Sequence, residues 1–143
     1  MSRKRLNKPK REANRMVELT VVARDRVGLL ADIGEILGKK GINIESVSVE
    51  ASGKTAMVHL NLGHAVESKK LLSDSGFRVV ERDKLLLRLK DQPGELAKVS
   101  RSLANANINI KNVYILDAER RQKILAVDTS DNSKARKLLK AYL

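Results

Sequence analysis

The sequence predicts an α+β protein made of two copies of one βαββαβ unit. The first observation is an internal repeat: the segments DRVGLL (25–30) and GINI (41–44) return as DQPGEL (91–96) and NINI (107–110). The offset is constant, since 91 − 25 = 66 and 109 − 43 = 66. The second observation is that apolar residues alternate with polar ones in some segments and recur at intervals of three and four residues in others. Together they predict two related units, each with strands and helices in the same order.

The first copy begins with alternating apolar residues at 17–23, which is typical of a half-buried strand. Apolar residues then recur at three and four from Leu29 to Leu37, which predicts an amphipathic helix, and Gly41 is a plausible left-handed cap beyond its end. The remaining predicted elements are a hairpin of strands 42–50 and 56–62 around a turn at 52–54, a helix at 65–75, and a fourth strand at 77–80.

The second copy repeats this order from Lys84 but ends before a fourth strand. Its predicted elements are a strand at 85–89, a helix around Leu96, Val99 and Leu103, strands at 108–116 and 122–128, and a helix at 132–142. The order is the ferredoxin-like arrangement, with the last strand missing from the second copy. Because that strand normally covers the edge beside the first, we expect residues 77–80 or a strand of a second subunit to cover 85–89.

Chain length favours two small units that pack together. A unit of about 60 residues buries only ~60% of its unfolded surface and is marginally stable alone. We therefore expect the two sheets to be paired side by side. The predicted organisation is a basic, disordered tail at 1–15, a first domain at 16–82 and a second at 83–143.

The amino-acid composition indicates in which compartment the protein lies and what it could bind. The net charge is +12, of which the tail at 1–15 carries +6 (seven basic residues and Glu12) and the residues from 16 to 143 carry the rest. Such a tail is a solvated arm, a phosphate-binding arm for nucleic acid, or the product of an upstream start codon, since Met16 lies just before the first strand. No apolar run reaches the ~20 residues of a membrane span, and the tail lacks the apolar core of a signal peptide. With no cysteine, these features predict a cytoplasmic protein.

The repeated loop joins a strand to a helix N-terminus, where unpaired N–H groups and the helix dipole favour an anion. Gly28 lets a ligand approach the backbone, Asp25 offers a carboxylate to an ammonium group, and Asn43 offers an amide; each has an equivalent 66 residues later. This combination suits a small amino acid. Each residue also has a structural interpretation: an N-cap for Asp25, a turn dihedral for Gly28, and a local turn bond for Asn43.

From residue 17 to 143, both copies resemble the ACT domain, a regulatory ferredoxin-like module. The resemblance implies side-by-side pairing of units, with an effector, usually an amino acid, bound between the first loop of one unit and the second strand of its neighbour. Ala23 and Leu89 stand where some serine-binding members have histidine. The predicted ligand-binding residues are Asp25, Gly28, Leu29, Asn43, Asp91, Gly94, Glu95 and Asn109.

We therefore predict a non-catalytic regulatory protein that binds an amino acid between ACT-like domains, needs no cofactor or metal, and forms a homo-oligomer, most simply a dimer. A regulated enzyme is a possible partner. The alternative is a nucleic-acid-binding protein that uses its basic tail and surface; against it, the chain has one Phe, two Tyr and no Trp for base stacking. An enzyme is disfavoured, because His59 and His64 lack the surroundings of a catalytic or metal site.

Overall fold

The computed structural model describes residues 15–119 and 121–143. Apart from Arg15, the predicted tail at 1–15 lies outside these residues. The described chain divides into two compact units, Val17–Arg82 and Asp83–Leu143, with Met16 assigned to the second. Within the described residues, no helix has the length and apolar character needed to cross a membrane.

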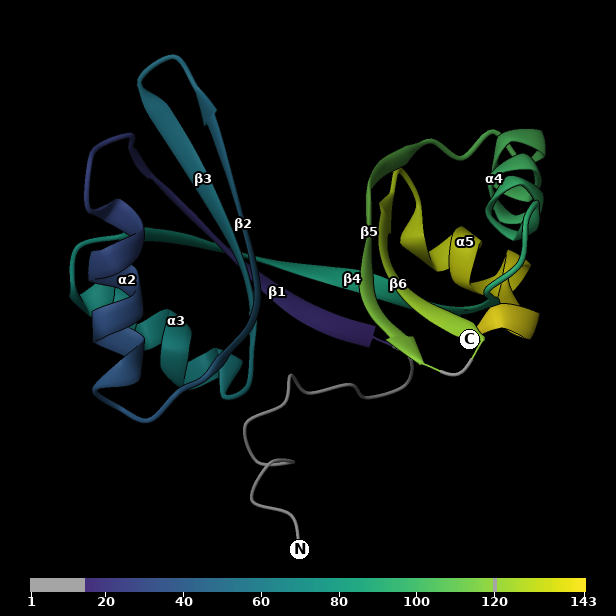
Figure 1. Cartoon of the computed structure of the whole chain (residues 1–143). Helices are drawn as coiled ribbons and strands as arrows, with labels where there is room; N and C mark the ends of the chain where they lie inside the picture. Colours follow the sequence, from purple (N-terminus) through teal and green to yellow (C-terminus); the bar gives the residue numbers. More distant parts are fainter. Residues whose placement is uncertain (1–14, 120) are drawn as a thin grey trace, which may run out of the picture. The chain divides into compact units, whose positions relative to one another are not determined.

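The first unit has the predicted βαββαβ order and strand order β2-β3-β1-β4. Figure 1 shows α2 and α3 on the same side of its strands. Its elements are β1 (Arg15–Arg24), α2 (Leu29–Gly38), β2 (Ile44–Ser52), β3 (Thr55–Leu62), α3 (Ala65–Asp74) and the first part of β4 (Arg78–Lys90).

The core of the first unit lies between its helices and its strands. Leu19 of β1 lies opposite Leu60 of β3 in the register, and both are fully buried. Ile33 and Leu37, four residues apart on α2, cover them from the helix side and are also fully buried. Each such side chain contributes roughly 1.5–3 kcal/mol when removed from water.

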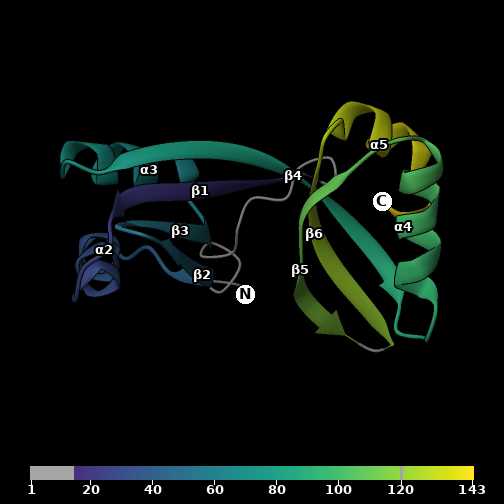
Figure 2. The same ribbon diagram turned by 90° about the horizontal axis from the view of Figure 1, so that it is seen from above.

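The second unit has strand order β4-β6-β5, with α4 and α5 on one side of its strands (Figures 1 and 2). Leu85 and Leu87 of β4 face those helices and pack with Val99 and Leu103 of α4. Its elements after β4 are α4 (Glu95–Asn105), β5 (Ile110–Glu119), β6 (Gln122–Thr129), α5 (Asn132–Leu138) and a 3₁₀ turn, η1 (Lys140–Tyr142). The helix predicted at 132–142 is therefore an α-helix followed by a 3₁₀ turn.

Strand β4 corrects one prediction. The strands predicted at 77–80 and 85–89 are parts of a single strand, Arg78–Lys90, which ends the first unit and begins the second. Residues 77–80 therefore do not cover the edge of 85–89. The neighbours of β4 in the strand order are β1 and β6. The ferredoxin-like class is confirmed, and no described strand follows α5 in the second unit.

The repeat extends to backbone details. Gly41 adopts φ 71°, and Asn107, 66 residues later, adopts φ 59°. Asparagine is one of the few other residues that tolerate this left-handed conformation, which explains the exchange of Gly for Asn. The pairing register shifts between Ile44 and Ser46 in β2, and at the equivalent Ile110 and Asn112 in β5. The two units thus share these irregular positions, while β5 has a further register shift between Ile115 and Asp117 that β2 lacks.

Candidate ligand-binding loops

The loop of the first unit ends on a left-handed glycine. Gly28 is the N-cap residue of α2, with φ 86°, and no side chain caps the helix there. The first i→i−4 bond of the helix runs from Asp32 N–H to the Gly28 carbonyl, so the N–H groups of Leu30 and Ala31 precede the regular ladder. The interpretation of Asp25 as an N-cap is therefore wrong. Its side chain is exposed, and only its main-chain N–H is engaged, by the Lys54 carbonyl at 2.8 Å.

Charged side chains of both signs surround this loop. Arg26 Nη2 lies 2.6 Å from Asp32 Oδ2 in an exposed ion pair, so a guanidinium is held beside the start of α2. Among the described residues, no side chain pairs with the Asp25 carboxylate. The loop thus presents N–H groups and a guanidinium to a carboxylate, and a free carboxylate to an ammonium group.

The loop of the second unit has the same backbone but different electrostatics. Gly94 adopts φ 87° at the N-cap of α4, again without a side-chain cap. Here Lys123 Nζ lies 3.1 Å from Asp91 Oδ1. Glu95 places a carboxylate in the first turn of α4 and pairs with Lys98 Nζ at 3.5 Å. Both helices have an acid in the first turn, Asp32 in α2 and Glu95 in α4, so the difference lies in the aspartates. Lys123 pairs with Asp91, whereas no described side chain pairs with Asp25, so this loop suits a zwitterion less well.

The predicted asparagines lie away from the loops of their own units. Asn43 follows α2, whereas Gly28 precedes it, and Figure 1 shows the two connections at opposite ends of the helix. Ten residues of helix separate them by about 15 Å. Asn43 Nδ2 is 3.5 Å from Glu45 Oε1, and the main-chain N–H of Asn109 donates to Ser130 Oγ at 2.9 Å. One unit therefore does not bring its loop and its asparagine together.

Leu29 has a structural place. Its side chain is buried in the core of the first unit, so only its backbone belongs to the surface of the loop. Other apolar side chains near the loop remain outside: Val27 is 101% exposed, and Leu30 is 43% exposed. These two exposed residues, rather than Leu29, are available for contact with another molecule.

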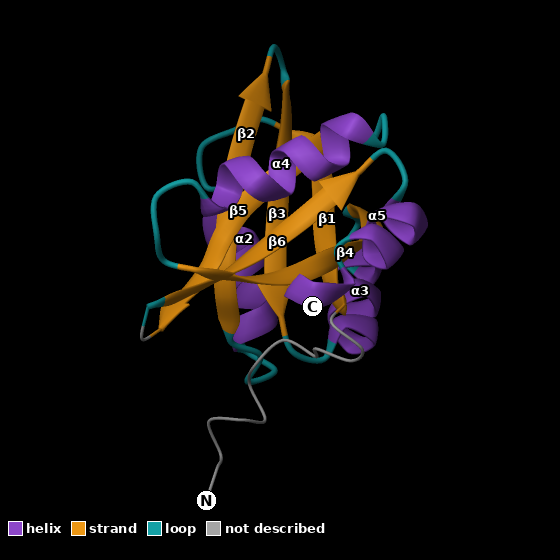
Figure 3. Cartoon of the chain, turned by 90° about the vertical axis from the view of Figure 1, so that its right-hand side faces the viewer, coloured by secondary structure: helices purple, strands orange, loops and turns teal. Residues whose placement is uncertain are grey.

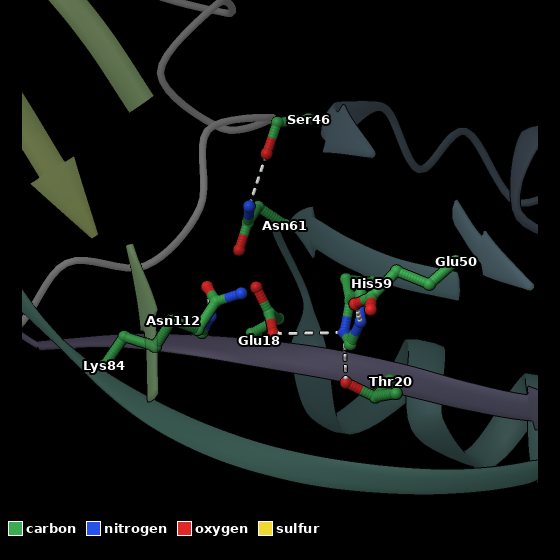
Figure 4. Close-up of polar contacts among 8 residues, drawn as sticks. All are labelled: Glu18, Thr20, Ser46, Glu50, His59, Asn61, Lys84 and Asn112. Carbon is green, nitrogen blue, oxygen red and sulfur yellow. Dashed lines mark hydrogen bonds and ion pairs between the residues drawn. The ribbon is translucent and has the colours of Figure 1, made fainter. Parts of the chain in front are cut away.

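Sequence reasoning missed a polar cluster on the strand face opposite the helices of the first unit (Figure 4). Thr20 Oγ1 and His59 Nδ1 lie 2.9 Å apart, and His59 Nε2 lies 2.8 Å from Glu50 Oε1. Glu18 Oε1 lies 3.5 Å from His59 Nδ1, and Asn61 bonds to Ser46. The placement of Glu18 and Thr20 on the polar side of strand 17–23 was the available signal. The buried Glu18 and Thr20 have partners here, which makes the cluster structural.

The second unit has a smaller polar contact on the strand face opposite its helices. Lys84 is buried, donates to Asn112 Oδ1 at 2.6 Å, and places its ammonium 4.8 Å from the centre of the Tyr114 ring. Within the described residues, no three His, Cys, Asp or Glu side chains gather as metal ligands would.

The βαββαβ order defines the first unit as a ferredoxin-like domain, with an exposed loop before its glycine-capped helix. Residues 17–72 match the family model of the ACT domain, so the first unit contains an ACT domain. This match indicates a regulatory, non-catalytic domain. Among curated proteins, none matches the chain.

Solved structures show the same fold over most of the chain. A protein of Bacteroides thetaiotaomicron is similar with a TM-score of 0.81 and 22% identity, over 90% of this chain and 88% of that one. The ligand-free regulatory subunit of aspartate kinase from Thermus thermophilus has a TM-score of 0.62 and 16% identity, over 92% of this chain and 93% of that one. The corresponding subunit from Thermus flavus has a TM-score of 0.57 and 16% identity, over 94% of this chain and 95% of that one. At these identities the likeness establishes the fold alone.

Proposed function

We propose that this chain is a non-catalytic regulatory protein, a tandem of ACT-like units, whose first unit binds a small amino acid. The observation that carries the proposal is the start of α2, which has a left-handed glycine and no side-chain cap. Arg26 and the carboxylate of Asp25 lie in the same loop. The ACT match over residues 17–72 supports the same role.

The α-carboxylate of the ligand accepts from the N–H groups at the start of α2, with Arg26 as a further donor. The ammonium group is held by Asp25. Bonds to charged groups are stronger than neutral ones, at ~1.5–3 kcal/mol each, so this small set of contacts is enough to orient a zwitterion. The second unit shares the backbone but contributes weaker binding, because Lys123 neutralises Asp91.

The other wall of the site comes from a second copy of the chain. Asn43 lies beyond the far end of α2, so the predicted set of loop and asparagine is complete only when two units contribute. Among the described residues, β2 pairs only with β3, and β5 only with β6. Both edge strands therefore lack a partner within the described chain, and β2 carries the exposed side chains Val47 and Val49. Pairing along this edge buries those side chains in a dimer.

A thermal-shift screen of the full chain against the twenty amino acids tests the proposal. A ligand at one hundred times its dissociation constant adds ~2.7 kcal/mol to the unfolding free energy. We expect a shift with at least one amino acid, reduced in Asp25→Ala and retained in Asp91→Ala. The absence of any shift contradicts amino-acid binding, and equal loss in both variants contradicts the assignment to the first unit.

A further inference from the structure

The positive charge of the two units is unequal. Residues 17–82 contain nine basic and nine acidic residues, so they are neutral, whereas residues 83–143 contain thirteen basic and seven acidic residues and carry +6. With the +6 of residues 1–16, these sum to the +12 of the chain. The net charge outside the tail therefore belongs to the second unit.

The excess lies on the helices of the second unit. α4, α5 and η1 together contain six basic residues and one acid, a net charge of +5. The equivalent helices of the first unit, α2 and α3, contain two basic and four acidic residues, a net charge of −2. Two units with the same fold thus differ by seven charges on the same layer, and fold requirements do not account for that difference.

The basic residues lie on neighbouring helices. α4 packs against α5, and Lys134 Nζ donates to the carbonyl of Ala106, the C-cap residue of α4, at 3.1 Å. Figure 3 shows the two helices on one side of the second unit's strands. We call the exposed side chains of this layer the basic helical face; they are Lys98, Arg101, Lys134, Lys137 and Lys140.

Local stabilisation explains only part of this face. Arg136 and Lys137 lie in the last turn of α5, where cations interact favourably with the helix dipole. Lys98 and Arg101 do not lie in the last turn of α4. Within the described residues, no carboxylate pairs with Arg101, Lys137 or Lys140. In the first unit, by contrast, Lys70 pairs with Asp74 at 3.0 Å.

We propose that the basic helical face binds the phosphate backbone of a nucleic-acid duplex. Duplex DNA carries one charge per ~1.7 Å of axis, so α4, about 16 Å long, can lie along roughly nine charges. The described side chains on this face include no aromatic platform for stacking bases, since Tyr142 packs against the core. This favours sequence-independent backbone contact. The inference stands apart from amino-acid binding, which uses the other unit.

The test is fluorescence anisotropy of a labelled 20-base-pair DNA duplex with the full chain, over a series of salt concentrations. The triple variant Arg101→Gln, Lys137→Gln, Lys140→Gln is compared with Lys39→Gln, Lys40→Gln, Arg78→Gln, which removes the same charge from exposed positions of the first unit. Both keep the tail intact. A third variant, Arg101→Lys, Lys137→Arg, Lys140→Arg, keeps the charge of the face.

We expect the first variant to weaken binding at least tenfold and to reduce the slope of log K against log salt by about 2–3, because each lost phosphate contact contributes ~0.9. The first-unit variant and the charge-preserving variant should keep the wild-type slope. Equal losses in the two neutralised variants, or no loss in either, overturn the proposal by assigning binding to net charge or to the tail. Displacement of the duplex by polyglutamate at equal charge concentration overturns it in favour of an acidic protein partner.

Discussion

The main-chain N–H of Asp25 donates a hydrogen bond to the Lys54 carbonyl at 2.8 Å, which fastens the loop before α2 to the β2–β3 turn. The second unit repeats this bond between Asp91 and Arg121, at 2.5 Å. In both cases the backbone holds the loop, and the aspartate side chain is not needed to shape it. Loop structure and ligand binding are therefore separable by mutation.

Asp25→Ala should leave the fold intact and weaken binding of the ligand. We expect the unfolding free energy to stay within about 0.5 kcal/mol of wild type, as for other surface changes. Binding should weaken by ~1–3 kcal/mol, because the ammonium group loses its charged acceptor. Calorimetric titration together with chemical denaturation measures both. Asp74→Ala, an exposed change on α3, is the control, and equal effects of the two substitutions on affinity would disprove the role of Asp25.

Gly28→Ala should destabilise the first unit by about 1–2 kcal/mol, the cost of a left-handed conformation for a residue with a Cβ. Space is not the cause, since the nearest atom to an added Cβ would be Arg26 Nη1 at 3.7 Å. Gly34→Ala is the matched control. Gly34 lies within α2 without a positive φ or a near neighbour, so alanine there should stabilise by about 0.5–1 kcal/mol. Urea denaturation measures the change in unfolding free energy for each variant, which should be negative for Gly28→Ala and positive for Gly34→Ala. Changes of the same sign would contradict this account of Gly28.

Val49→Glu should dissociate the proposed dimer. Val49 is 50% exposed on β2, which pairs with β3 alone among the described strands. A charge on that edge opposes pairing with a second copy. Val66→Glu adds the same charge at an 83% exposed position on α3. Sedimentation velocity should show a monomer for the first variant and a dimer for the second. A wild-type monomer at all concentrations would argue against the shared site.

Asn132 connects α5 to two strands and should be costly to remove. Its Oδ1 accepts from both Thr129 N–H and Thr129 Oγ1 at 2.8 Å, and its Nδ2 donates to the Asp83 carbonyl and to Asp128 Oδ1 at 3.1 Å. Asn132→Ala should lower the unfolding free energy by about 1–3 kcal/mol, because the N–H and hydroxyl groups of the buried Thr129 lose their acceptor. Ser133→Ala, one residue later and exposed, should change it by less than about 0.5 kcal/mol. Thermal denaturation followed by circular dichroism compares them.

The sequence predicted the order of elements because the repeat and the apolar periods agree. The prediction failed at Glu81, Arg82 and Asp83, three charged residues that lie between the strands predicted at 77–80 and 85–89. They are exposed within a single strand, where the backbone ladder rather than side-chain burial sets the conformation. The pattern of polar and apolar residues along one strand does not show which other strands pair with it.

For the site, the loop glycines were predictable because a strand-to-helix turn needs a left-handed residue. The difference between the two loops was not, because Lys123 reaches Asp91 from another strand. The separation of Asn43 from Gly28 follows from the length of α2 and was implicit in the element order. The polar cluster around His59 depends on the register of three strands, which the sequence alone does not fix.

The most direct test of the account is subunit complementation, measured as calorimetric stoichiometry. Asp25→Ala and Asn43→Ala should each abolish tight amino-acid binding when pure. After the two variants are mixed in equal amounts, dissociated and reassociated, about half of the dimers are mixed, and each mixed dimer has one complete site. The account predicts recovery of about a quarter of the wild-type sites at wild-type affinity, whereas a mixture that stays empty contradicts a site shared between copies.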